Sequence, residues 1–394
     1  MHIAILGPID TKSLFPAIKK KDIRTLPMGH GVTVLSQLAL GLLDLGHQVS
    51  VVTLSNDINN NIVIYKNNKF KIYYCPVRKR AFRFNDGSIG RAANFWYQEI
   101  KFMQKALLND NPQIVNAHWA YEYAFAAILA KKKYILTTRD IPHIILKYET
   151  TLYRLVRFIM AGIALKVSKN ISTISNYAKL KTQLYTNRFI HVIPNPSIKD
   201  VPKLKIKKKL NKKIRIIMIN NGFSFRKNIK IALKAFKEFN KNFSNSNLTL
   251  FGHDMERHNT CYTWAKKNCL IKNVIFRGSL DKKSLMKILP NYDILLHTSL
   301  EESFGNIFLE AMMSGVPLIA GKNSGAAPEI VRGFGLLVDV NNIKEIINGL
   351  NKYALNPKLW SKIRVSAYKN VKKKYSQKNI VTKYLSLYKK ILRK

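Results

Sequence analysis

Short apolar runs alternate with amphipathic segments along the first half of the chain. The runs MHIAILG (1–7), HQVSVVTL (47–54) and YILTTRD (134–140) have the length and apolar content of buried strands. Between such runs, residues 32–46 and 143–167 carry apolar side chains at the period of a helix. Short buried strands separated by helices are typical of a parallel sheet with both faces covered.

The same alternation begins again after a basic stretch near residue 200. We therefore expect an α/β protein made of two doubly wound, Rossmann-like domains that face each other across a cleft. One large sheet is the alternative, but 394 residues exceed the size at which a single core usually stops growing. The expected parts are an N-terminal domain at 1–197, a basic linker at 198–213, a C-terminal domain at 214–365 and a basic helix at 366–394.

The chain is strongly basic, with 67 Lys and Arg against 22 Asp and Glu and a net charge of +45. Attraction to a polyanion, either nucleic acid or an anionic membrane face, is one interpretation, and a compositional bias toward Lys, Asn and Ile is the other. The three cysteines have no metal or redox spacing, which suits a reducing cytosol. No apolar run approaches the roughly 20 residues of a membrane span, and the N-terminus lacks the charged lead of a signal peptide. We expect a cytoplasmic location.

Ligands of such folds bind beyond the C-terminal ends of the strands, and the first half places polar or flexible residues there. Gly29 and Gly31 precede a predicted helix, where glycine lets backbone N–H groups approach an anion. His118 ends one apolar strand and Asp140 ends the next. A histidine in this place can hydrogen-bond a substrate or act as an acid or base. The alternatives are a structural His118 and an Asp140 that merely pairs with Arg139.

The second half places a cationic pair, Arg226 and Lys227, after a strand and before a helix. This position suits a diphosphate, with Arg acting as a fork and Lys as a point charge. Because Lys and Arg are so common in this chain, the position of the pair is more informative than its composition.

Two glutamates enclose a predicted helix start in the segment TSLEESFGNIFLEAMMSG. Glu302 lies in the loop after a strand, and Glu310 lies on the helix that follows. The backbone N–H groups around Phe304, Gly305 and Asn306 can receive phosphate oxygens. A buried Glu310 would be satisfied by accepting hydrogen bonds from two vicinal sugar hydroxyls. The alternative is a helix-start glutamate followed by a surface glutamate.

This segment resembles the family 4 retaining glycosyltransferases of the GT-B fold (glycosyl transferases group 1). The family carries E-x7-E followed by a G-x-P-like turn, which stands here at 302–312 and 315–317. Residues 324–331 resemble its "GG.pEiv" segment and 335–338 its "GllV" segment. Further matches in the family's order are the Gly29–Gly31 loop and residues 45–49, 117–118, 193–195 and 227–228.

The resemblance implies retaining transfer of a hexose from a UDP- or GDP-linked sugar, without a cofactor or a metal ion. Glu310 would hold the ribose hydroxyls of the donor, and Glu302 would contact the donor hexose. His118 would hydrogen-bond the transferred sugar, so His118 and Glu302 are the expected catalytic residues. Lys227, with Arg226, would neutralise the diphosphate as it leaves.

The resemblance also implies that the Gly29–Gly31 loop faces the phosphates and that the C-terminal helix packs back toward the N-terminal domain. The chain departs from the family's pattern at three places. The phosphate-clamp arginine about five positions before the lysine is Gly222 here, and Arg226 is the expected substitute. Asn228 and Pro196 stand where the family has glycine.

No two aspartates are separated by one residue, so the D-x-D metal motif of the other major glycosyltransferase fold is absent. We assign no covalent nucleophile, because the family is retaining through attack on the face from which the leaving group departs. The expected acceptor is a glycan or a lipid-linked molecule in cell-surface polysaccharide synthesis. The basic linker, residues 78–80 and 131–133 and the helix at 144–167 favour peripheral association with the inner face of the cytoplasmic membrane, and a solvated charged surface is the alternative.

Two other function classes remain open from the residues alone. A nucleic-acid-binding protein would account for the charge, but the tyrosines of the basic tail follow a helical period and indicate packing. We therefore expect no nucleic-acid partner. A sugar-nucleotide epimerase or a phosphorylase on the same double fold is the second alternative, and the pattern around Glu302 argues against it.

Overall fold

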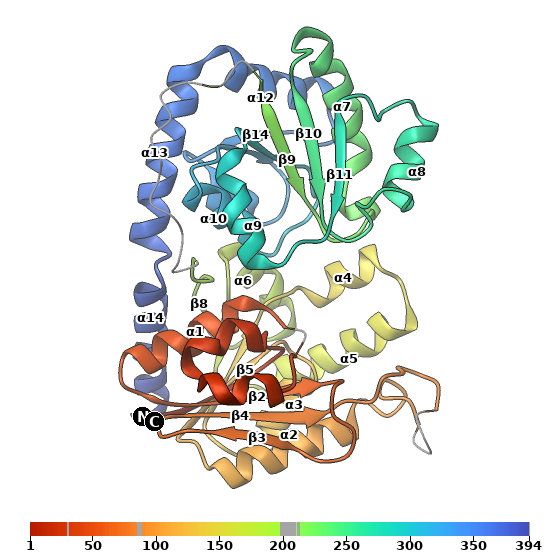
Figure 1. The fold of residues 1–394 in the computed structure, drawn as a ribbon. Coiled ribbons are helices and arrows are strands. Elements are labelled where there is room, and N and C mark those ends of the chain that lie inside the picture. Colours follow the sequence, from red (N-terminus) through yellow and green to blue (C-terminus); the bar gives the residue numbers. More distant parts are fainter. Residues whose placement is uncertain (30, 85–88, 198–209, 211–212, 394) are drawn as a thin grey trace. The chain divides into compact units, whose positions relative to one another are not determined.

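The computed structural model describes residues 1–29, 31–84, 89–197, 210 and 213–393. It divides into two compact units, Met1–Pro196 together with Gln377–Lys394, and Ser197–Ser376 (Figure 1). The expected linker at 198–213 falls almost wholly outside the described residues. In the part of the chain that is described, no helix has both the length and the apolar content needed to cross a bilayer.

The first unit is built on an eight-stranded sheet. Its strands are β1 (His2–Leu6), β2 (Gln48–Ser55), β3 (Val63–Lys66), β4 (Phe70–Pro76), β5 (Ile114–His118), β6 (Tyr134–Thr138), β7 (Ile171–Thr173) and β8 (Ile190–Val192). They lie in the order β3-β4-β2-β1-β5-β6-β7-β8. The predicted parallel sheet is confirmed for every neighbouring pair except β3 and β4, which are antiparallel. The connection at 67–69 is too short for the crossover that parallel strands require.

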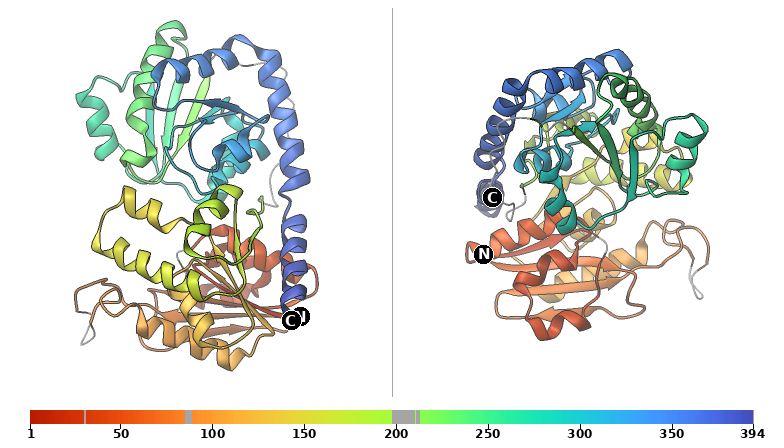
Figure 2. Two further views of the ribbon diagram at one scale, coloured as in Figure 1. Left: turned by 180° about the vertical axis from the view of Figure 1, so that it is seen from behind. Right: turned by 45° about the horizontal axis from the view of Figure 1, so that its top comes forward.

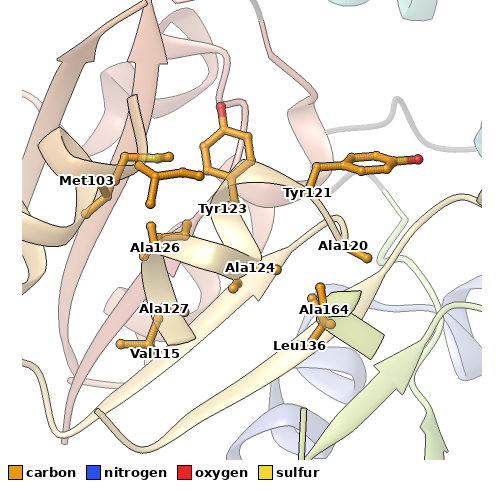
Figure 3. Close-up of a cluster of buried hydrophobic side chains, with 14 of the residues drawn as sticks. Met103, Val115, Ala120, Tyr121, Tyr123, Ala124, Ala126, Ala127, Leu136 and Ala164 are labelled. Atoms are coloured by element: carbon orange, nitrogen blue, oxygen red, sulfur yellow. The ribbon is translucent and has the colours of Figure 1, made fainter. Parts of the chain in front are cut away.

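Helices cover both faces of this sheet (Figure 2). They are α1 (Thr33–Asp44), α2 (Tyr97–Asp110), α3 (Glu122–Leu129), α4 (Pro142–Tyr148), α5 (Leu152–Val167), α6 (Asn176–Thr182) and α14 (Gln377–Arg393). One core joins the sheet to α2, α3 and α5, and a second core joins it to α1 and α14. In the first core, Ala124, Ala126 and Ala127 of α3 lie between Met103 and Leu136 (Figure 3). These small side chains let α3 approach the strands closely.

The prediction of one continuous helix at 143–167 is wrong, because two helices occupy this range. Glu149 leaves the helical region at φ −133° and ends α4. The side chain of Thr151 then accepts a hydrogen bond from the backbone N–H of Arg154 and begins α5. A threonine cap competes effectively with an uninterrupted helix, although the apolar period continues through the break.

The second unit contains a six-stranded, fully parallel sheet. Its strands are β9 (Arg215–Ile219), β10 (Asn247–Phe251), β11 (Val274–Gly278), β12 (Ile294–His297), β13 (Leu318–Gly321) and β14 (Leu336–Val338), in the order β11-β10-β9-β12-β13-β14. Its helices are α7 (Ile229–Asn242), α8 (Thr260–Lys267), α9 (Lys282–Ile288), α10 (Asn306–Met313), α11 (Ala327–Val331), α12 (Ile343–Leu355) and α13 (Pro357–Lys374). Because β9 and β12 are central neighbours, the loops that follow them meet at one edge of the sheet.

The chain returns to the first unit through α14. The expected boundary at residue 365 lies inside α13, which ends at Lys374, and the basic tail then forms α14. The Nε2 atom of Gln377 donates to the carbonyl of Gln37 at 2.6 Å, and the Nδ2 atom of Asn116 donates to the hydroxyl of Tyr388 at 2.6 Å. Gly41 of α1 permits this contact, because a Cβ there would lie 2.6 Å from Val381.

Candidate active site

Three side chains of the second unit meet where β9 and β12 end. Lys227 lies in the 3₁₀ turn Phe225–Lys227 between β9 and α7, and His297 is the last residue of β12. Glu302 lies in the loop after β12 and joins them: its Oε1 atom is 2.8 Å from the Nζ atom of Lys227 and 3.1 Å from the Nε2 atom of His297. The predicted residues Lys227 and Glu302 are therefore in direct contact.

The ion pair fixes Glu302 in its charged form. Burial alone would raise the pKa of this carboxyl group, but the charge of Lys227 and the hydrogen bond with His297 outweigh burial and hold the pKa well below its usual value. The site therefore keeps one negative charge and one positive charge side by side at neutral pH. Such a pair can reorient toward a ligand that carries both hydroxyl groups and phosphate oxygens.

The turn before α10 requires glycine. Gly305 has φ +81°, and a Cβ at this position would lie 2.3 Å from the ring of Phe308. The helix therefore begins at Asn306 and presents its first backbone N–H groups at the wall of a pocket. The side chain of Phe304 is buried, with its ring 6.1 Å from that of Tyr375, so only the backbone of Phe304 remains for donor binding.

Glu310 is buried on the first two turns of α10, as the argument for a ligand-binding carboxylate required. Its partner in the structure is Lys282, the first residue of α9, which forms an ion pair with its Oε1 atom. The side chain of Lys282 is 29% exposed, so it can turn toward solvent when Glu310 accepts other donors. Sequence reasoning missed Lys282, because one more lysine in so basic a chain carries no signal.

These residues line one pocket of about 310 Å³, entirely within the second unit. Its lining residues are Ile219, Asn220, Asn221, Lys227, Phe251, Gly252, Ser279, Leu280, Lys282, Leu285, His297, Glu302, Gly305, Asn306, Ile307 and Glu310. The pocket thus brings together Lys227, Glu302, Gly305, Asn306 and Glu310 of the predicted site. His297 was missed, although its place at the end of an apolar strand is the same signal that identified His118.

Arg226 lies beside the pocket but is not among its lining residues. Its Nη1 atom donates to the carbonyl of Glu301 at 3.3 Å, and its own carbonyl accepts from the N–H of Leu300. In this arrangement Arg226 ties the turn after β9 to the loop after β12. Asn228, which replaces the family's glycine, has φ +52°, a region that asparagine tolerates better than most residues.

A separate polar cluster lies in the first unit, where β5 and β6 end. His118 is fully buried, and its Nδ1 atom accepts a hydrogen bond from the Nε atom of Arg139 at 3.0 Å. Arg139 also donates from Nη1 to the Oδ1 atom of Asn195 at 2.5 Å. The Nε2 atom of His118 has no hydrogen-bond partner among the described residues. Burial, and then the charge of Arg139, lower the pKa of His118 well below its usual value.

This contact determines the form of the His118 ring. A guanidinium N–H can only donate, so Nδ1 must accept and the proton of the neutral ring lies on Nε2. His118 is therefore built as a hydrogen-bond donor, and not as a base at Nε2.

Asp140 does not pair with Arg139, whose hydrogen bonds go to His118 and Asn195. Instead, its Oδ2 atom accepts from the hydroxyl of Tyr121 at 3.0 Å. Burial raises the pKa of Asp140 to about 6, even though the Tyr121 hydrogen bond and the charge of Arg157 act in the opposite direction. The alternative of a merely ion-paired Asp140 is thus not what the structure contains.

We expect Asp140→Asn to be more stable than the unchanged protein at pH 7.5, with a smaller difference at pH 4.5 that approaches zero only below the pKa of the unfolded carboxyl, about 3.9. The unfolded carboxyl loses its proton near pH 3.9 and the folded one near 6, so the folded state binds more protons between these values. Ionising Asp140 therefore costs stability above pH 6, on the order of 1–3 kcal/mol. Midpoints of urea unfolding at both pH values measure this. Glu149→Gln, a partly exposed carboxylate of the same unit, is the control, and a gap that widens toward low pH would contradict the expectation.

The glycines before α1 pack directly on the segment that follows β1. A Cβ at Gly31 would lie 2.2 Å from the backbone N of Ile9, and Gly29 has φ +53°. Both glycines are thus required by the close approach of this loop to Ile9. His30 lies outside the described residues.

Comparison with known proteins finds a family model that matches the second unit. Residues 200–374 match the family model described as glycosyl transferases group 1. Among curated proteins, the chain is 24% identical over 389 residues to N-acetyl-alpha-D-glucosaminyl L-malate synthase of Bacillus anthracis, covering 93% of this chain and 94% of the relative. The matched range includes Lys227, Glu302 and Glu310.

Solved structures share the fold of the whole chain. Sucrose-phosphate synthase from Thermosynechococcus elongatus superposes with a TM-score of 0.78 at 15% identity, covering 100% of this chain and 99% of that one. Anabaena HepE, in complex with UDP and glucose, gives a TM-score of 0.68 at 14% identity, covering 99% and 100%. At these identities the likeness shows the fold, and the predicted GT-B architecture is confirmed.

Proposed function

We propose that this chain, whose residues 200–374 match the family model of glycosyl transferases group 1, is a family 4, retaining and metal-independent hexosyltransferase. The proposed donor is a UDP- or GDP-linked sugar. The proposed acceptor is a glycan or a lipid-linked molecule of cell-surface polysaccharide synthesis, met at the cytoplasmic face of the membrane. The protein is thus an enzyme of the glycosyltransferase class, and donor, acceptor and stereochemistry are the parts proposed here.

The arrangement of Lys227, Glu302 and Glu310 around one pocket carries the proposal. Transfer develops positive charge at the anomeric carbon and negative charge on the leaving diphosphate. Lys227 and the backbone N–H groups at the start of α10 are suited to the diphosphate. Glu302 is suited to the hexose hydroxyls and Glu310 to the ribose hydroxyls. Lys282, freed from Glu310 by such a ligand, would add a second cation for the phosphates.

His118 supports the proposal from the first unit. With Nδ1 occupied by Arg139, it can donate from Nε2 to a hydroxyl oxygen of the transferred sugar. Its lowered pKa keeps the ring neutral, so the donor capacity does not vary across the physiological pH range. Arg139 is in this view a positioning residue, which acts through His118.

Thermal unfolding in the presence of UDP-, GDP- and ADP-linked sugars tests the proposal. We expect one nucleotide class to raise the Tm by roughly 5–10 °C at about 100 times its Kd, because the ligand binds only the folded protein. Oligonucleotides at the same charge concentration are the control. A salt-sensitive shift with oligonucleotides and none with any nucleotide sugar would contradict the enzyme reading and favour a nucleic-acid-binding protein.

A further inference from the structure

Helix α5 carries an apolar stripe on its exposed side. Leu152, Leu155, Ile159, Ile163 and Val167 are 62%, 43%, 43%, 48% and 50% exposed. They follow one another at intervals of three, four, four and four residues, which places them along one face of the helix. A helix face that meets only water normally carries polar side chains, so this face requires another explanation.

The loop between β4 and α2, together with the first residue of α2, adds aromatic side chains on the same side of the first unit. Phe82, Phe84 and Phe95 of the loop are 38%, 70% and 47% exposed, and Tyr97 of α2 is 58% exposed. All three ribbon views place this loop and the α4–α5 pair on one side of the unit (Figures 1 and 2). The two elements also touch, because the ring of Trp96 at the end of the loop lies 5.4 Å from that of Tyr153 on α5.

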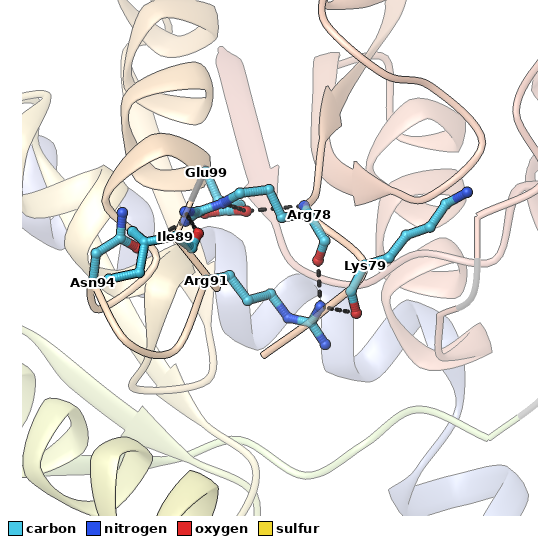
Figure 4. Close-up of polar contacts among 6 residues, drawn as sticks. All are labelled: Arg78, Lys79, Ile89, Arg91, Asn94 and Glu99. Atoms are coloured by element: carbon cyan, nitrogen blue, oxygen red, sulfur yellow. Dashed lines mark hydrogen bonds and ion pairs between the residues drawn. The ribbon is translucent and has the colours of Figure 1, made fainter. Parts of the chain in front are cut away.

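Polar contacts hold the base of this loop in place (Figure 4). Arg78 donates to both carboxylate oxygens of Glu99, from Nε at 2.9 Å and from Nη2 at 2.6 Å, and to Asn94 at 2.8 Å. Arg91 donates to the carbonyls of Arg78 and Lys79. Because Glu99 lies on α2, the loop is anchored to the body of the unit, and its exposed aromatic side chains start from a fixed base.

Both elements lie in strongly basic parts of the chain. Residues 141–190 contain eight Lys and Arg and one Asp or Glu, and Arg157 pairs with Glu122 outside this range, which leaves 8 − 1 − 1 = +6. Residues 77–97 contain five Lys and Arg and one Asp or Glu, and Arg78 pairs with Glu99 outside this range, which leaves 5 − 1 − 1 = +3. Apolar side chains on one helix face within a basic segment are the pattern of helices that lie in the surface of an anionic bilayer.

We propose that the α5 stripe and the exposed aromatic side chains of the β4–α2 loop form a binding face for a bilayer of anionic phospholipid. Moving Leu and Ile side chains from water into a bilayer lowers the free energy. The same side chains offer neither stacking nor hydrogen bonds to nucleic acid, so they favour a lipid surface over a nucleic-acid partner. Phenylalanine and tyrosine suit the boundary between headgroups and acyl chains, while the lysines reach the anionic headgroups. This inference rests on the proposed function only in that a lipid-linked acceptor would be met at this face.

Flotation of the full chain with vesicles tests the face. Vesicles of phosphatidylcholine alone are compared with vesicles that contain phosphatidylglycerol, without any donor or acceptor. We expect binding to rise with the phosphatidylglycerol fraction, and to fall about tenfold or more in Ile159→Glu/Ile163→Glu. The matched control is Leu108→Glu/Leu355→Glu, which makes the same charge change at exposed positions of α2 and α12 and should bind as the unchanged protein does.

Equal vesicle binding by the α5 variant and the unchanged protein would overturn the proposal, and so would equal loss in the control. Size-exclusion chromatography with light scattering tests whether a second copy of the chain binds this face instead. A dimer that dissociates only in the α5 variant, together with no vesicle binding, would assign the face to dimerisation. Nucleotide-sugar thermal shifts of the same variants keep the two hypotheses separate. If no nucleotide sugar shifts the Tm of any variant or of the unchanged protein, the proposed function is contradicted, but the vesicle result is unaffected.

Discussion

Replacing Lys227 by methionine is expected to reduce kcat/KM for the nucleotide sugar by roughly 10²–10³-fold. The substitution removes the cation proposed for the leaving diphosphate, and loss of one such donor usually costs 10²–10³ in rate. It also leaves Glu302 without the lysine 2.8 Å away that keeps its carboxylate ionised in a largely buried place. Initial rates of donor turnover and the Tm of the variant measure the two effects.

The matched control is Lys234→Met, which removes an exposed lysine from α7, the helix that follows Lys227. It should change neither the rate nor the Tm beyond the small effects of surface substitutions. If Lys227→Met lowers the Tm but turns the donor over at the normal rate, the ion pair with Glu302 is structural and the diphosphate is held elsewhere. Equal rate losses in both variants would instead point to the general charge of the protein.

Glu310→Ala is expected to abolish the donor-induced rise in Tm while the protein stays folded without ligand. Hydrogen bonds to a charged group contribute about 1.5–3 kcal/mol each, so losing two ribose contacts should weaken nucleotide binding by about 10²-fold or more. The fold should survive, because the side chain of Lys282 is 29% exposed and can solvate its charge once the carboxylate is gone. Thermal shifts and isothermal calorimetry with the best nucleotide make the measurement.

Glu345→Ala is the control for this experiment, because Glu345 also forms an ion pair with a lysine, Lys322, but lies outside the pocket. The 2′-deoxy form of the same nucleotide sharpens the test. The unchanged protein should bind it more weakly than the ribonucleotide, and Glu310→Ala should bind both equally. A variant that still prefers the ribonucleotide would contradict the assignment of Glu310 to the ribose.

The sequence was sufficient for features that depend on one strand and the loop after it. Apolar runs and helical periods predicted the strands of both sheets. The same patterns placed Lys227 and Glu302 in loops after strands, and the resemblance assigned both to one donor; the structure shows them in contact although 75 residues separate them. The glycine between Glu302 and Glu310 also predicted the helix start, which the structure places at Asn306.

Two kinds of feature could not be predicted: a local cap inside an unbroken apolar period, and contacts that depend on the tertiary structure. The apolar period from 143 to 167 hides the break between α4 and α5, which a single threonine cap decides. Lys282 reaches Glu310 from α9, which follows the edge strand β11, and no spacing in the sequence encodes that contact. Likewise, the sequence suggests that Arg139 pairs with its neighbour Asp140. In the structure, the side chain of Arg139, just after β6, instead reaches His118 at the end of the adjacent strand β5.

The path of the chain through α14 has a consequence for the order in which the protein is made. The buried hydrogen bond between Asn116 and Tyr388 joins residues 272 positions apart, and the whole second unit lies between them. During synthesis, the second unit can complete its core as soon as α13 has left the ribosome, whereas the first unit waits for α14 with one face of its sheet covered by α1 but still incomplete. The half of the protein that is translated first is therefore the last to finish folding, and in the interval its exposed apolar face is the part most in need of a chaperone.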